Sequence, residues 1–203
     1  SGKVGCAIAT SGPGGMNFVT PIGNCFYDSI PCLFITGQIN SKFLRPDPSI
    51  RQVGFQETDI VSIVKPITKY AVMLTKATDV KYELEKALHL ATEGRAGPVL
   101  LDIPLNISKE VIETDDLVGF KQIKKEYNWP QARKAIEQYF QDLQSAKRPT
   151  IMVGGGIRTA DAVESLYELL SILKIPVFPT WNALDIICDD NPYYGGRVGT
   201  YGG

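Results

Sequence analysis

Two glycine-rich turns stand where the chain could hold a ligand. The first is Ser11-Gly12-Pro13-Gly14-Gly15, directly after an apolar run, and the second is Gly154-Gly155-Gly156, directly after another. Glycines let a backbone approach a ligand closely, and a helix that begins at such a turn offers free N–H groups to an anion. Both turns are therefore candidate cofactor sites, and the alternative for each is an ordinary tight connection between a strand and a helix.

The residues around these turns argue against two common nucleotide sites. The first turn lacks the Lys-Ser/Thr ending of a P-loop, which disfavours nucleoside triphosphates. The second keeps only the first two glycines of the dinucleotide fingerprint, which also needs an acidic residue about 20 residues further on. The next apolar run instead ends in Pro179-Thr180-Trp181-Asn182. A nicotinamide cofactor is therefore not predicted.

Other groups able to do chemistry are sparse. His89 is the single histidine, and it follows Glu85 by four residues in a segment of helical period, which favours a surface pair along a helix over a catalytic base. The cysteines have neither a CxxC spacing nor that of a disulfide framework, and each has apolar neighbours. We predict buried free thiols in a reducing cytoplasm, and no metal site. The cysteines are Cys6, Cys25, Cys32 and Cys188.

Charge and composition exclude several classes of partner. The 203 residues include 21 Lys and Arg against 22 Asp and Glu, for a net charge of −1. This balance gives no electrostatic footprint for nucleic acid or an anionic membrane. No apolar run reaches the roughly 18–20 residues of a membrane span, and the opening Ser1-Gly2-Lys3 is not a signal peptide. A cytoplasmic globular protein with a small-molecule ligand is predicted.

The elements that must position these turns follow a regular alternation. Apolar, β-branched runs alternate with segments of helical period, which predicts an α/β fold with a parallel sheet. The strands are expected at residues 4–9, 31–35, 97–104, 150–153 and 175–178. The helices are expected at residues 16–27, at 77–93, from Trp129-Pro130 onwards, and after a cap at Thr159.

Two segments fall outside this alternation. Residues 39–54 hold two prolines and the basic residues Lys42, Arg45 and Arg51, and we expect a long functional loop. Residues 110–128 are charged and lack a sustained period, which predicts a linker between domain 1–109 and domain 129–203. The chain stops soon after a strand, so a sheet with unpaired edges is expected. In the second domain an apolar stripe follows one helix: Ile136, Tyr139, Phe140 and Leu143.

Five segments, in order along essentially the whole chain, resemble the acetolactate synthase family of thiamine-diphosphate carboligases. They are GKVGCAIATSGPG at 2–14, DSIP at 28–31 with ITGQ at 35–38, GFQETD at 54–59 with KPITK at 65–69, GR at 94–95 with GPVLLDIP at 97–104, and GGG at 154–156. The resemblance implies the parallel-sheet thiamine-diphosphate-enzyme fold, with a partial N-terminal pyrimidine-binding domain (1–109), a linker (110–128) and a partial central, flavin-side domain (129–203).

The resemblance also implies cofactors and an assembly. Thiamine diphosphate, FAD and Mg²⁺ are expected, and the Mg²⁺ would be held by a domain beyond this chain. The catalytic glutamate of the family would precede Ser1, and the metal-holding domain would follow Gly203. The chain is thus expected to be an internal fragment, inactive alone, of a homodimer or homotetramer that works on 2-oxo acids in branched-chain amino acid biosynthesis.

Site residues are carried over by position within the matching motifs. Pro13, Gly14 and Asn17 would sit against the pyrimidine, while Phe55 and Gln56 would line the substrate channel, with the Gln56 amide offered to a substrate oxygen. The positions that match the flavin site are Arg95, Gly154, Gly155, Gly156, Thr180, Trp181 and Asn182, with residues 198–201 as weaker members. Without the resemblance, Gln56-Glu57 would be the solvated start of a strand and Arg95 a surface residue at a helix end.

Three departures from the family pattern leave the acceptor substrate open. Leu105 stands where these enzymes carry a lysine, the loop holding Arg45 and Arg51 is longer, and Thr200-Tyr201 replaces a Met-His pair. The leading expectation is transfer of a two-carbon unit from pyruvate to a second 2-oxo acid. The alternatives are a keto-sugar nucleotide acceptor, whose phosphates arginine would suit, a 2-oxo-acid decarboxylase, and a non-catalytic nucleotide-binding α/β module.

Overall fold

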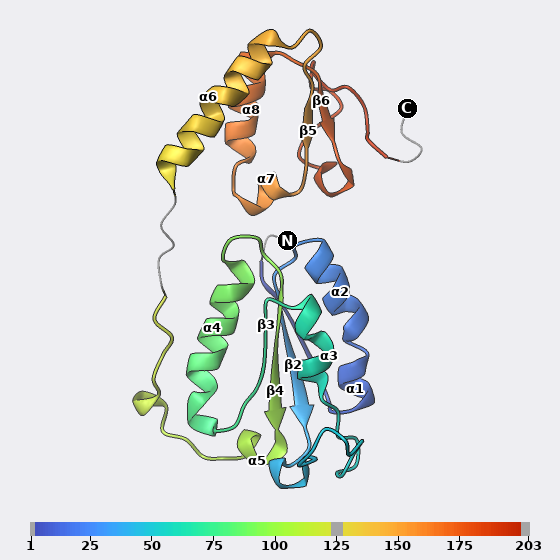
Figure 1. Ribbon diagram of the computed structural model, residues 1–203, viewed down its shortest axis with the longest axis vertical. Coiled ribbons are helices and arrows are strands. Elements are labelled where there is room, and N and C mark those ends of the chain that lie inside the picture. Colours follow the sequence, from blue (N-terminus) through green and yellow to red (C-terminus); the bar gives the residue numbers. More distant parts are fainter. Residues whose placement is uncertain (1–2, 123–127, 200–203) are drawn as a thin grey trace. The chain divides into compact units, whose positions relative to one another are not determined.

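The computed structural model describes residues 3–122 and 128–199. The chain divides into two compact units, residues 1–123 and 124–203. The first unit contains a four-stranded sheet and the second a two-stranded sheet, and every strand pair is parallel. The predicted α/β class with parallel sheets is therefore confirmed (Figure 1).

The sheet of the first unit has the strand order β1-β2-β4-β3. Its strands are β1 (Gly5–Ala9), β2 (Cys32–Gln38), β3 (Tyr70–Met73) and β4 (Pro98–Pro104). β2 pairs with both β1 and β4, so Thr36 lies opposite Ala9 on one side and Asp102 on the other. Because all the strands are parallel, their carboxyl ends meet at one edge, which is where open α/β sheets bind ligands.

Helices cover both faces of this sheet. α1 (Pro13–Met16), α2 (Val19–Tyr27) and α3 (Ile60–Val64) lie on one face and α4 (Val80–Thr92) on the other (Figure 1). Successive strand residues point to opposite faces. Phe34 and Leu100 accordingly pack in one core cluster with residues of α2 and α3, whereas Leu33 packs in another with residues of α4. Strands covered on both faces read as the continuous apolar runs seen in the sequence.

Several predicted boundaries in the first unit are wrong. The helix expected at residues 16–27 is two helices, because α1 ends at Met16 and α2 begins at Val19. The sequence did not predict β3 or α3, since each is only four or five residues long. The expected loop 39–54 contains one short 3-10 helix, η1 (Ser41–Phe43). The other short elements are η2 (Lys65–Ile67), η3 (Ala77–Asp79), α5 (Leu105–Ser108) and η4 (Thr114–Asp116).

Part of the predicted linker packs against α4. The backbone N–H of Phe120 donates to Glu85 Oε2 at 2.7 Å, and the Phe120 ring lies against Tyr82 and His89, with centroids 5.6 and 5.5 Å away. His89 therefore pairs with Glu93, at 3.5 Å, and not with Glu85 as predicted. The pairing along the helix is present, but the predicted partner was wrong because the Phe120 N–H binds the Glu85 carboxylate.

The second unit has its own core. Its elements are α6 (Trp129–Ser145), β5 (Ile151–Val153), α7 (Gly156–Thr159), α8 (Val163–Leu173), β6 (Val177–Pro179) and η5 (Trp181–Ala183). Val153 and Val177 of the two strands pack with Leu166 and Leu170 of α8. Thr159 was predicted to cap the helix that follows it. It is instead the last residue of α7, and Ala162 precedes α8 without a side-chain cap.

The apolar stripe of α6 is only half covered. Ile136, Tyr139 and Phe140 are 53%, 46% and 45% exposed, and the helix contributes no buried residue over Trp129–Ser145. Its N-terminus is set by Asn128, whose side chain accepts a hydrogen bond from the Gln131 N–H at 3.1 Å. The sequence predicted this helix correctly, and the Asn128 cap explains where the helix begins. Neither observation says what the apolar side of the helix faces.

The cysteines are free thiols, as predicted, but they are not buried. Cys6 and Cys188 are exposed, and Cys25 and Cys32 are half-buried. Cys6 is exposed because β1 pairs only with β2. Over the described residues, no helix is both long and apolar enough to cross a membrane.

Candidate functional site

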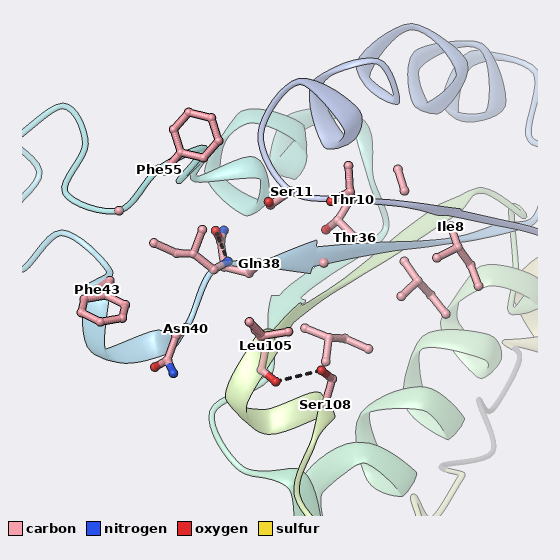
Figure 2. A pocket seen from close by; sticks show the side chains of 16 residues that line it. Ile8, Thr10, Ser11, Thr36, Gln38, Asn40, Phe43, Phe55, Leu105 and Ser108 are labelled. Carbon is pink, nitrogen blue, oxygen red and sulfur yellow. Dashed lines mark hydrogen bonds between the residues drawn. The ribbon is translucent and has the colours of Figure 1, made fainter.

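A pocket of about 700 Å³ opens at the carboxyl edge of the first sheet (Figure 2). The ends of β1, β2 and β4 form its floor, and the loop after β2 forms a wall. Its lining is mainly apolar, with a few polar groups, as is usual for a small-molecule site. Its members include Ile8, Ser11, Ile35, Gln38, Phe55 and Leu105.

The first glycine turn touches the loop that carries Gln56. Gly12 has φ +63°, and a Cβ there would lie 2.8 Å from Gln56 Cβ and 2.9 Å from Gln56 O. Gln56 itself has φ +60°, a conformation that non-glycine residues adopt rarely. At Gly14, a Cβ would lie 2.7 Å from Thr10 Cγ2, so the Thr10 side chain would have to move. Packing therefore requires glycine at Gly12, where two segments more than 40 residues apart in the chain meet.

The residues predicted to contact the pyrimidine lie beside the pocket and do not line it. Pro13 and Gly14 are in α1, and Asn17 follows as its C-cap, with its N–H donating to Pro13 O at 3.1 Å. Phe55 lines the pocket and is 86% exposed, whereas Gln56 lies against Gly12 outside the lining. Figure 2 shows Phe43 and Phe55 beyond the end of β2, with Ile8 at the opposite end of the pocket.

Glu57 fixes the shape of the loop, a role that the sequence analysis did not predict. Its buried carboxylate accepts hydrogen bonds from the N–H groups of Arg45, Val53 and Gly54, at 2.7, 2.8 and 3.4 Å. Burial raises the pKa of Glu57, but these donors outweigh it and hold the pKa below its usual value. The alternative of a solvated strand start at Gln56-Glu57 is therefore wrong, since Glu57 is 8% exposed and a helix, α3, follows.

Arg45, one of the two arginines of the long loop, is already engaged. Its guanidinium donates to Asp59 Oδ2 at 3.2 Å and to Ile50 O at 3.3 Å. Burial raises the pKa of Asp59, yet the Ser62 N–H and Arg45 bring it below the usual value. Arg45 thus stabilises the loop on the start of α3, which leaves Arg51 as the exposed arginine of this segment.

A buried polar network lies under the pocket floor and was also missed. Asp102 accepts hydrogen bonds from Thr36 Oγ1 at 2.7 Å and from Gln38 Nε2 at 2.9 Å. Burial raises the pKa of Asp102 to about 6, against the lowering effect of these two donors. The partners are 66 and 64 residues away in sequence, so no local pattern could identify them.

The second glycine turn meets the end of β6. The Thr180 N–H donates to Val153 O at 2.8 Å, and a Cβ at Gly155 would lie 3.1 Å from Asn182 O. A Cβ at Gly156 would meet nothing within 4 Å. The structure thus brings Gly154 and Gly155 to Thr180 and Asn182, and packing accounts for Gly155 but not for Gly156.

The remaining residues assigned to the flavin are less closely associated with this turn. Trp181 is 70% exposed, and a Cβ at Gly199 would lie 2.7 Å from its Nε1. Arg95 belongs to the first unit, where its guanidinium donates to Ser29 Oγ at 2.7 Å and to Tyr27 O at 3.2 Å. Of the weaker members at 198–201, residues 200 and 201 lie outside the described residues, as does the Thr200-Tyr201 departure.

The pocket residues fit the pyrimidine part of thiamine diphosphate. Apolar side chains such as Ile8, Ile35 and Leu105 suit a heteroaromatic ring, and Ser11 and Gln38 supply polar groups beside it. A divalent metal has no evident ligands here: across residues 3–122 and 128–199, no group of three or more His, Cys, Asp or Glu side chains could hold an ion. In the second unit, the open space at Gly156 is compatible with a close-lying cofactor.

Comparison with known families identifies the class of protein. Residues 1–63 match the model described as thiamine pyrophosphate enzyme, N-terminal TPP binding domain, and residues 136–203 match thiamine pyrophosphate enzyme, central domain. Thiamine pyrophosphate is another name for thiamine diphosphate. The chain belongs to the thiamine pyrophosphate enzyme family, which confirms the family predicted from sequence.

Within this family the chain is similar to acetolactate synthases. It is 39% identical over 207 residues to the acetolactate synthase large subunit of Corynebacterium glutamicum, and 36% identical over 202 residues to the isozyme 2 large subunit of Escherichia coli. It is also 36% identical over 199 residues to a glyoxylate carboligase of Escherichia coli O157:H7. These alignments cover 98–100% of this chain but only 31–35% of each relative, so the chain spans about a third of their length.

Proposed function

We propose that the chain provides the pyrimidine side of the active site in a thiamine-diphosphate-dependent carboligase. The enzyme would take a two-carbon unit from pyruvate and add it to a second 2-oxo acid, as expected of an acetolactate synthase-like transferase. The observation that carries the proposal is the contact of the Gly12 turn with Gln56, beside an apolar pocket at the carboxyl edge of the sheet. The similarity to acetolactate synthases supports it.

The chain's own residues would position the reactants and exclude water. When bound, the cofactor supplies the carbon nucleophile and accepts the electron pair released by decarboxylation. Pro13, Gly14 and Asn17 hold its pyrimidine from the α1 side, and the apolar pocket wall keeps bulk water from the reacting centre. The Gln56 amide would donate a hydrogen bond to a substrate oxygen, and the packing of its backbone against Gly12 would hold the residue in place. Phe55 would line the substrate channel beside Gln56.

The second unit would hold FAD without a part in the net reaction. Gly154, Gly155 and Gly156 form the turn facing the cofactor, and Thr180, Trp181 and Asn182 flank it from the end of β6. The open space at Gly156, which packing does not explain, supports this assignment. Arg95 is the residue of the first unit that we assign to the flavin diphosphate, for the bidentate bonding that a guanidinium offers to phosphate.

The choice of 2-oxo acid has two candidates. One relative is a glyoxylate carboligase, so glyoxylate is the competing substrate. Phe55, an exposed apolar side chain of the proposed substrate channel, favours a substrate that carries a methyl group, which pyruvate has and glyoxylate lacks. A keto-sugar nucleotide acceptor is less well supported than the sequence suggested, because Arg45 is bonded to Asp59 and Ile50. The Mg²⁺ and a second subunit would complete the site.

The test uses the gene product that contains this chain, supplied with thiamine diphosphate, FAD and Mg²⁺. Pyruvate alone should yield CO₂ and acetolactate in equal amounts, and glyoxylate should react more slowly. Gln56→Ala should lower kcat about 100-fold by removing a donor to the reacting oxygen, while Gln144→Ala, an exposed substitution on α6, should have no effect. Release of CO₂ without a ligated product would indicate a decarboxylase, and no reaction with either acid would overturn the proposal.

A further inference from the structure

Three buried polar side chains join the ends of β2 and β4 beneath the pocket. Thr36 and Asp102 are each 1% exposed and Gln38 is 6% exposed. Thr36 and Gln38 line the pocket, as Figure 2 shows, whereas Asp102 lies behind them and does not. A buried carboxylate is costly unless its oxygens accept hydrogen bonds, so this group needs a structural or functional reason.

Asp102 fixes the orientation of the Gln38 amide. Gln38 Nε2 donates both to Asp102 Oδ2, at 2.9 Å, and to the Thr58 carbonyl, at 2.7 Å, while Gln38 Oε1 accepts from the Ile39 N–H at 2.9 Å. With Oε1 on Ile39, the amide must present its NH₂ to residue 102, which must therefore accept. Thr58 stands two residues after Gln56, so this chain of bonds leads from the sheet to the loop.

The other oxygen of Asp102 acts on the glycine turn through Thr36. Thr36 Oγ1 donates to Asp102 Oδ1 at 2.7 Å, which sets the Thr36 rotamer. The methyl group of Thr36 then faces Gly15, where an added Cβ would lie only 3.3 Å from Thr36 Cγ2. One carboxylate is thus linked to both segments of the candidate site. The link to the turn at 11–15 runs through Thr36, and the link to the loop at 54–58 runs through Gln38.

We propose that Asp102 is a positioning residue, which holds the glycine turn through Thr36 and the Phe55–Gln56 loop through Gln38. The assignment of these two segments to the site rests on the proposed function, but their coupling through Asp102 does not. Asp102 touches neither cofactor nor substrate, since it is buried behind the pocket lining. Its role is to keep the two segments in register.

Protonation of Asp102 should release one of the two segments. A protonated carboxyl has one oxygen that carries hydrogen, so it loses an acceptor for Thr36 or for Gln38. Burial places the pKa of Asp102 at about 6, the Thr36 and Gln38 donors oppose this, and Asp59 adds to the rise. Asp59 is itself paired with Arg45 at the start of α3. Loss of the Thr36 or the Gln38 donor raises the pKa of Asp102 further, so opening of the segment that this donor holds takes up a proton. That one segment should therefore become less ordered as the pH falls through about 6.

Hydrogen–deuterium exchange on the full gene product tests the proposal without cofactor or substrate. At pH 7.5, Asp102→Leu removes both acceptor oxygens and keeps the branched shape, so exchange should rise about tenfold at both 9–17 and 53–59. Thr36→Val keeps the methyl group and should affect mainly 9–17, whereas Gln38→Met should affect mainly 53–59. Asp116→Asn, which removes a charge from exposed η4, should change neither segment, and the α4 peptide 80–92 should stay constant in all variants.

A pH series separates positioning from a general loss of stability. After correction for intrinsic exchange rates, one of the two wild-type segments should loosen with a midpoint near pH 6, and this transition should vanish in Asp102→Leu. The proposal is overturned if the transition persists in that variant, if Asp102→Leu loosens only one segment, or if α4 loosens equally. Should Asp102→Leu not fold, the opposite selectivities of Thr36→Val and Gln38→Met decide. Selective loosening without any carboligase activity would leave the coupling standing and remove the proposed function.

Discussion

The two glycine turns look alike in sequence and differ in what surrounds them. In the first unit, an added Cβ would lie 2.8 Å from Gln56 at Gly12, 2.7 Å from Thr10 at Gly14 and 3.3 Å from Thr36 at Gly15. In the second, Gly155 is close to Asn182 at 3.1 Å, but Gly154 has only an ordinary contact and Gly156 none. The first turn is therefore glycine-rich because the protein packs on it, and the second keeps a position that packing leaves free.

This difference separates two reasons for a glycine. Where neighbouring protein atoms leave no room for a Cβ, the glycine is needed for packing, and its replacement should lower the stability of the fold. A glycine with open space beside it imposes nothing on the fold, and its replacement should be visible only when a ligand approaches. Substitutions along the two turns therefore distinguish structural from ligand-facing glycines.

The largest effect is expected for Gly12→Ala. At φ +63° and ψ −125° Gly12 has a backbone conformation that is strained by about 1–3 kcal/mol for an L-residue, and the clash with Gln56 adds about 1–2 kcal/mol. The free energy of unfolding should fall by about 3 kcal/mol, as measured by urea denaturation, and activity with 2-oxo acids should be lost. A variant that keeps wild-type stability would show that Gln56 moves aside easily.

A smaller effect is expected for Glu57→Gln, which changes the partner of that turn. A neutral amide accepts hydrogen bonds less strongly than the carboxylate and brings an NH₂ group toward backbone donors, so about 2 kcal/mol should be lost at pH 7. Because the folded pKa of Glu57 lies below its usual 4.5, this stability is present above about pH 4.5 and is lost as the pH falls through the folded pKa.

The measurement for Glu57 compares urea midpoints of the wild type and the variant at pH 7 and pH 3. The two proteins should differ at pH 7, and the difference should shrink at pH 3 as the carboxylate takes up a proton. Glu110→Gln, an exposed change in the segment after α5, serves as the control for charge. An equal difference at both pH values would mean that side-chain shape, and not the charge, holds the loop.

Gly155→Ala should have a modest effect. The new Cβ would lie 3.1 Å from Asn182 O and 3.2 Å from Asn182 Cβ, so η5 must shift by a few tenths of an ångström. We expect a loss of about 1 kcal/mol, measured as a lower midpoint in urea. Flavin binding should weaken as well, since Asn182 would move. A loss as large as that of Gly12→Ala would erase the distinction between the two turns.

The smallest effect on stability, and the sharpest test, is expected for Gly156→Ala. Gly156 is the first residue of α7, its Cβ would have open space, and alanine is preferred over glycine in helices by about 0.5–1 kcal/mol. Stability should therefore rise slightly, while FAD retention, read from the visible absorbance of the purified protein, should fall. Retention equal to that of the wild type would place the flavin elsewhere.

The sequence predicted well what depends on local pattern. The α/β class, the strands of the first sheet apart from β3, and the position of both glycine turns follow from apolar runs and glycine clusters. The residues taken over from the family pattern, such as Phe55 and Gln56, were found beside the first turn. These features are encoded within short windows, which is why periodicity and motif could find them.

What the sequence did not predict depends on distant contacts. Glu57 is a buried acceptor only because the loop folds back over 12 residues to Arg45, and Asp102 meets Thr36 only because β2 and β4 are neighbours in the sheet. The His89 partner was wrong for the same reason, since Phe120 occupies Glu85 from 35 residues away. An acidic residue inside an apolar strand, such as Asp102, is the one signal that could have pointed to the network.

The carboxylate of Glu57 also bears on how such an enzyme can diverge. By binding the backbone at Arg45, Val53 and Gly54, it closes residues 46–52 into a solvent-exposed lobe. Lengthening a loop whose ends are already joined costs little free energy. Insertions and substitutions can thus accumulate in this lobe during evolution, while the contact between Gln56 and the Gly12 turn is preserved.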